Sequence, residues 1–108
     1  MDAAASVNGW GSPEALVALY NAQTPDECPA VQTLSPKRRD KARRYLAQFP
    51  SETFWADVMA QVCASPFLRG QRKRPGHEGF VADFDWLLTT GKDGSENCVK
   101  VKEGRYRG

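Results

Sequence analysis

The chain has 108 residues, of which 41% are apolar and 26% charged, and its formal net charge is +2. A chain of this size forms one small domain and buries about 60–70% of the surface that its unfolded form exposes. That is enough for one core but not for a core and a deep ligand cavity. No segment has the roughly 18 apolar residues of a membrane span, and the N-terminus lacks the pattern of a signal peptide. The sequence therefore predicts a cytoplasmic protein.

The cysteines and the single histidine argue against a disulfide framework or a zinc site. Cys28, Cys63 and Cys98 are odd in number and widely spaced, and His77 is the only histidine. A disulfide framework needs an even, denser set of cysteines, and a structural zinc site needs four ligands. We therefore expect free thiols and no metal or other cofactor.

Three helices are predicted after a flexible lead-in over residues 1–11, within a single domain over residues 12–108. Ser12-Pro13 and Ser35-Pro36 each combine a capping serine with a proline suited to the first helical position. The second helix buries residues at helical spacing and ends at Pro50, and Ser51 caps a third helix that Pro66 closes. The apolar stripes contain Leu16, Leu19 and Tyr20, then Ala42, Tyr45, Leu46 and Phe49, then Trp55, Val58, Met59 and Val62.

The C-terminal third is ambiguous from its pattern. Residues 69–79 form a basic, glycine-bearing segment that we expect to be a mobile loop. The alternation over 80–88 and 98–102 favours strands joined by a hairpin loop, but Phe84, Leu87 and Leu88 also share one helical face. The fold class predicted is mainly α, a bundle of three to four short helices with an irregular or β-hairpin C-terminal segment. An α+β fold is the alternative.

Two basic clusters are candidates for contact with phosphate. Lys37, Lys41 and Arg44 lie opposite the apolar stripe of the second helix and should face solvent. Three cations occupy its first turn, where the helix dipole disfavours each by about 0.3–1 kcal/mol. A solvated surface explains both clusters, and tolerance of that cost in the second helix raises the alternative of an anion site there. The nucleic-acid contacts predicted are Lys37, Arg38, Lys41 and Arg44, and in the basic loop Arg69, Arg72, Lys73 and Arg74.

Aromatic residues are the candidates for partner contact. Trp55, Phe67, Phe84 and Trp86 could stack on unpaired bases, although core packing explains Trp55 and Phe67 better. We predict partner contacts at Trp10, Phe67, Trp86 and Tyr106. Catalysis has little support, because His77 has no nucleophile in a constrained motif and Asp83 and Asp85 lack a third metal ligand. We therefore expect no enzymatic activity.

An ordered series of segments carries a family resemblance. The segments are residues 14–21 (EALVALYN), 34–39 (LSPKRR), 54–55 (FW), 64–70 (ASPFLRG), 82–88 (ADFDWLL) and 99–106 (VKVKEGRY). Over roughly residues 12–106 the chain resembles the C-terminal domain of phage and prophage replication proteins, the replisome organisers or helicase-loader-like proteins. It departs from them in a longer connection at residues 90–97, and it has no room for their N-terminal winged-helix domain.

The resemblance implies a non-enzymatic role in phage DNA replication inside a bacterial host cell. Such domains are expected to bind DNA, here single-stranded DNA, and to recruit the host replicative helicase or its loader. A shortened, stand-alone chain implies the alternative function, an adaptor or inhibitor that occupies a host protein.

Overall fold

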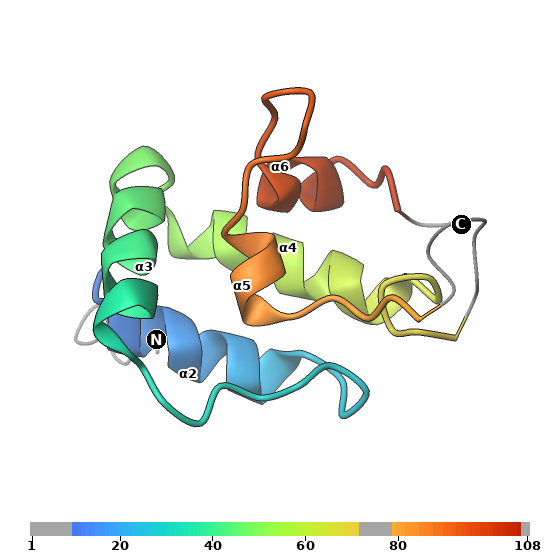
Figure 1. Cartoon of the computed structure of the whole chain (residues 1–108), viewed down its shortest axis with the longest axis horizontal. Coiled ribbons are helices and arrows are strands. Elements are labelled where there is room, and N and C mark those ends of the chain that lie inside the picture. Colours follow the sequence, from blue (N-terminus) through green and yellow to red (C-terminus); the bar gives the residue numbers. More distant parts are fainter. Residues whose placement is uncertain (1–9, 72–78, 107–108) are drawn as a thin grey trace.

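The computed structural model describes residues 10–71 and 79–106, and within these ranges the chain is mainly α-helical (Figure 1). The helices are α2 (Pro13–Gln23), α3 (Pro36–Gln48), α4 (Glu52–Ala64), α5 (Phe84–Leu87) and α6 (Asn97–Lys102). The described residues contain no β-strand, only one isolated antiparallel bridge between Thr90 and Glu96. The mainly α fold class predicted from the sequence is thus confirmed.

Serine side chains begin the first three helices as predicted. The hydroxyls of Ser12, Ser35 and Ser51 each accept a hydrogen bond from the amide three residues on, at 3.1, 3.3 and 3.3 Å. Each bond satisfies one of the N–H groups that have no partner inside the helix. The predicted ends also hold, because α2, α3 and α4 each end two residues before a proline, at Pro25, Pro50 and Pro66.

Helix α4 forms the centre of the molecule and supplies much of the core. Its residues Trp55, Val58, Met59 and Val62 are at most 1% exposed. Helix α2 packs against one side of α4 and α6 against another, while α3 packs on α2 (Figure 1). The apolar stripes predicted from the sequence meet in this core, including Leu16 and Tyr20 of α2 and Ala42, Tyr45 and Leu46 of α3.

The C-terminal third resolves the ambiguity of its pattern in favour of short helices. The alternation over residues 98–102 favours a strand, but these residues belong to helix α6. Cys98 and Val101, spaced by three, both face the hydrophobic core of the protein. Asp83 caps α5 by accepting a hydrogen bond from the Trp86 amide at 2.8 Å. The hairpin alternative is therefore wrong for the flanking segments, although the Thr90–Glu96 bridge does close the loop between them.

The lead-in and the basic loop fall largely outside the described ranges. Residues 1–9 and 72–78 are not described, and these include Arg72, Lys73, Arg74 and His77. Trp10 belongs to the folded part, since its indole nitrogen donates to the carbonyl of Pro50 at 2.7 Å. In the part of the chain that the structure describes, no helix is long and apolar enough to cross a membrane.

Two buried thiols are expected to make the stability of the fold depend on pH in the alkaline range. Cys28 and Cys98 are at most 4% exposed, and burial raises the pKa of Cys28 to about 11 and of Cys98 to about 12, from 9.0. Between pH 9 and about 11, both thiols therefore stay mostly neutral in the folded chain, whereas they ionise in the unfolded chain. Their contribution to stability is complete below pH 9 and is lost as the pH rises toward 11 and 12.

We expect the free energy of unfolding to fall above pH 9, by up to about 1.4 kcal/mol per pH unit for each thiol. Urea unfolding between pH 7 and 10.5 measures this fall. A Cys28→Ala/Cys98→Ala variant should be less stable at pH 7 but should show a flatter profile. Equal slopes in the two proteins would contradict the assignment to these thiols.

Candidate nucleic-acid interface

Helix α3 presents three cations along one line of its surface. Lys37, Lys41 and Arg44 are spaced by four and three residues, which places them on one helical face. The apolar residues of α3 lie toward the core, so Lys37 and Arg44 are exposed and Lys41 is half-buried. We refer to Lys37, Lys41 and Arg44 as the α3 stripe. The solvent-facing position predicted from the sequence is confirmed for Lys37 and Arg44.

The other three cations of α3 are held in ion pairs. Arg38 pairs with Asp85, Arg39 with Glu14 of α2, and Arg43 with Asp40 one turn earlier. Among the described residues, no carboxylate lies within ion-pair distance of any member of the α3 stripe. The hydrogen bond from Arg39 also lowers the pKa of Glu14. The described part of the chain therefore divides the cations of α3 into three with a carboxylate partner and three without one, a division that the sequence alone did not show.

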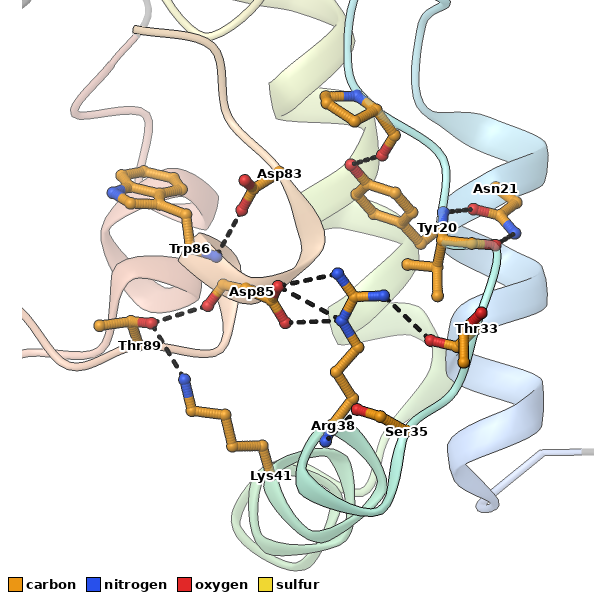
Figure 2. A network of polar contacts seen from close by, with 12 residues as sticks. Tyr20, Asn21, Thr33, Ser35, Arg38, Lys41, Asp83, Asp85, Trp86 and Thr89 are labelled. Carbon is orange, nitrogen blue, oxygen red and sulfur yellow. Dashed lines mark hydrogen bonds and ion pairs between the residues drawn. The ribbon is translucent and has the colours of Figure 1, made fainter.

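Arg38 joins α3 to α5 and to the segment before α3 (Figure 2). Its Nε donates to Asp85 Oδ1 and Oδ2 at 3.1 and 3.3 Å, and its Nη2 donates to Oδ2 at 3.0 Å. On the other edge, Nη1 donates to the Thr33 carbonyl at 2.9 Å. These bonds to Asp85 raise the pKa of Arg38. In this structure Asp85 thus occupies the Nε and Nη2 donors of Arg38, and the contact of Arg38 with nucleic acid stays a prediction.

An open pocket of about 520 Å³ lies beside this ion pair at the start of α3. It is lined by Thr33, Ser35, Lys37, Arg38, Lys41 and Asp85. Two members of the α3 stripe thus stand at its wall, and Lys41 Nζ reaches Thr89 Oγ1 at 3.4 Å across from α3 (Figure 2). The lining carries three positive charges and one negative charge, so the pocket has a net charge that favours anions.

Arg69, the first cation of the second predicted cluster, binds other residues of the folded chain. Its guanidinium pairs with Glu27 at 3.0 Å and donates to the Cys63 carbonyl at 3.4 Å. The pair lowers the pKa of Glu27. Arg69 thus already has partners inside the folded chain, and its contact with nucleic acid stays a prediction. Arg72, Lys73 and Arg74 lie outside the described residues, so the structure does not place them.

The predicted partner-binding aromatics do not form one exposed surface. Phe67 is only 4% exposed and stacks between the rings of Phe80 and Tyr106, at centroid distances of 5.1 and 6.0 Å. The prediction of an exposed Phe67 is therefore wrong, because it is a core residue of this ring cluster. Trp86 meets Phe80 and Tyr106 edge to face at 5.1 and 5.4 Å, and both Trp86 and Tyr106 are half-buried.

The C-terminal end of this cluster is tied to α4. The Ser65 hydroxyl donates a hydrogen bond to the Tyr106 carbonyl and accepts one from the Leu68 amide. Trp10 is also half-buried and lies at a separate place, beside Pro50. Trp10 and Trp86 are therefore held by the fold with part of each ring reaching the surface.

Sequence reasoning missed Asp85 as a site residue and considered it only as half of a metal pair. Asp83 caps α5 and Asp85 pairs with Arg38, so the two carboxylates serve different helices. Within residues 10–71 and 79–106, no group of three His, Cys, Asp or Glu side chains is arranged to hold a metal ion. A signal was present in the segment Asp83-Phe84-Asp85-Trp86, because aspartate is a favoured N-cap residue, but the sequence does not show which of the two aspartates is the cap.

Comparisons with protein families, curated proteins and solved structures found no match to this chain. The fold and the site define a small, mainly α domain that carries a line of cations without an ion-pair partner in the described part of the chain, beside an open, net positive pocket.

Proposed function

We propose that this chain is a non-enzymatic domain that binds the phosphate backbone of a nucleic acid through the α3 stripe. One observation carries the proposal. Three of the six cations of α3 form ion pairs with carboxylates of the same chain, and the other three, which have no such partner among the described residues, fall on one face. Scattered solubilising charge does not require such an alignment.

The dimensions of the stripe suit a nucleic-acid strand. Lys37 and Arg44 are separated by seven residues, which at 1.5 Å per residue is about 10 Å along the helix axis. Each strand of a DNA duplex carries one charge per about 3.4 Å of helix axis, so this length corresponds to about three phosphates of one strand in that geometry. Thr33 and Ser35 line the pocket at the start of α3 together with Lys37. Contacts of this kind position a backbone and do not read its sequence.

The biological setting of the proposal rests on the sequence resemblance. Phage replication domains of this kind act in the cytoplasm of the bacterial host, and their expected ligand is single-stranded DNA. Recruitment of the host replicative helicase or its loader is part of the same proposal. We propose these roles together, with the α3 stripe as the DNA contact.

Fluorescence anisotropy with labelled oligonucleotides tests the proposal. The protein is titrated into a 30-nucleotide single strand, and into its duplex, at 50 mM salt. We expect saturable binding with the single strand bound at least as tightly as the duplex. Absence of binding to both at 50 mM salt would rule out the proposed function.

A protein-interaction adaptor is the second candidate, and the half-buried rings favour it. Trp86 and Tyr106 lie together at one surface position with Phe80, where they can offer aromatic area to a partner. Purified replicative helicase and purified loader are the two probes, immobilised in turn. Retention of the wild-type chain and loss of retention in Trp86→Ala would support the adaptor function, whereas equal retention of both would oppose it.

A further inference from the structure

The Arg38 guanidinium is anchored on one edge and closed by a carboxylate on the other. Nη1 donates to the Thr33 carbonyl at 2.9 Å, a contact that does not involve Asp85. Nε and Nη2 form the second edge, and both donate to the Asp85 carboxylate at 3.0 to 3.3 Å. Removal of the carboxylate would therefore free the Nε and Nη2 donors while the bond from Nη1 to Thr33 remains available.

That second edge suits phosphate as well as carboxylate. Guanidinium groups bind both anions through two parallel N–H···O bonds, with similar geometry. The edge borders the pocket of about 520 Å³, and Lys37 and Lys41 line the same pocket. A phosphate in this pocket could thus contact the two lysines and compete with Asp85 for Arg38.

The Arg38–Asp85 pair is placed where such competition costs little. The side chains are 33% and 47% exposed, so water screens their attraction. Ion pairs at this exposure contribute about 0–1 kcal/mol to stability. Asp85 also lies on the four-residue helix α5, whose N-cap is Asp83, so the start of that helix does not depend on the Asp85 side chain.

We propose that Asp85 competes with nucleic-acid phosphate for Arg38, and that Arg38 is a latent fourth phosphate ligand beside the α3 stripe. This inference rests on the proposed function, because it names a residue that limits affinity at the same site. In the wild-type chain Asp85 retains Arg38, so three cations contact phosphate. Without the Asp85 charge, four do.

The first test compares Asp85→Asn with the wild type by anisotropy against the single-stranded oligonucleotide. One additional phosphate contact changes the slope of log K against log salt by about −0.7 and raises affinity about fivefold at 0.1 M salt. The matched control is Glu96→Gln, which removes one negative charge from a residue that forms no ion pair among the described residues. A gain in Asp85→Asn no larger than the gain in Glu96→Gln would overturn the proposal.

The second test shows whether the gain passes through Arg38. We expect Asp85→Asn/Arg38→Ala to lose the gain, while Asp85→Asn/Arg105→Ala, which has the same net charge, keeps most of it. In the wild-type background, Arg38→Ala and Arg105→Ala should weaken binding by similar small factors. Equal affinities of the two double variants would overturn the proposal.

A third measurement separates this inference from the proposed function. The Arg38 Nε–H resonance is followed by NMR during titration with inorganic phosphate. We expect a saturable shift in Asp85→Asn at lower phosphate concentration than in the wild type. If the wild type fails to bind oligonucleotide but this difference is seen, the proposed function fails and the competition stands. Identical titrations in the two proteins would overturn the competition itself.

Discussion

Replacement of Lys37, Lys41 and Arg44 together by glutamine is expected to lower the affinity for single-stranded DNA about 100-fold at 0.1 M salt. Each lost phosphate contact removes a factor of about five at this salt concentration, and three such factors multiply. The fold should persist, because these side chains form no ion pair with a described residue and surface substitutions change stability by about 0.5 kcal/mol or less. Anisotropy measures the affinity, and circular dichroism verifies the fold.

A charge-matched variant separates a specific surface from overall charge. Lys92, Lys102 and Arg105 are exposed and lie outside α3, so their replacement by glutamine lowers the net charge from +2 to −1, as in the first variant. We expect this control to bind within a few-fold of the wild type. Equal losses in the two triple variants would mean that the α3 stripe is not a defined contact surface.

Replacement of Trp55 by alanine is expected to reduce the free energy of unfolding by about 3–5 kcal/mol. Trp55 is 0% exposed, and its indole nitrogen donates to the Phe49 carbonyl at 2.8 Å. Its ring meets Phe54 and Phe49 edge to face, at centroid distances of 5.2 and 6.3 Å. The substitution opens a cavity beside α4 in the core. It also removes the hydrogen-bond donor to the carbonyl of Phe49, the C-cap residue of α3.

Urea unfolding measures this loss, and Phe54→Ala is its neighbouring control. Phe54 stacks on Phe49 at 4.7 Å but is only half-buried, so its loss should be clearly smaller. The total stability of a small domain is about 5–15 kcal/mol, so Trp55→Ala should leave the protein marginally folded. A loss below about 1 kcal/mol would contradict the central position of Trp55.

Local signals in the sequence predicted the first three helices because their causes are local. A serine cap acts on an amide three residues away, and a proline stops a helix within two residues, so both are visible in a short window. The tail was ambiguous because α5 and α6 have only four and six residues. At that length, the apolar residues fit the period of a strand as well as the period of a helix. Packing against α4 therefore determines which structure forms.

The candidate site was only partly predictable for a different reason. The spacing of Lys37, Lys41 and Arg44 is a property of one helix, so the α3 stripe could be derived from the sequence. Which cations are neutralised is a property of the tertiary fold, because the partner of Arg38 lies 47 residues away. Arg69 and Glu27 are similarly distant, 42 residues apart. Residue type alone therefore does not show which cations already form an ion pair with a distant carboxylate.

The salt dependence of DNA binding is the most direct test of the central claim, that three cations of α3 contact phosphate. Affinity for the single-stranded oligonucleotide is measured from 50 to 300 mM salt for the wild type and for the Lys37/Lys41/Arg44→Gln variant. For three contacts the slope of log K against log salt is expected to be steeper by about 2 in the wild type than in the variant. The same slope in both proteins would show that the α3 stripe does not contact the nucleic acid.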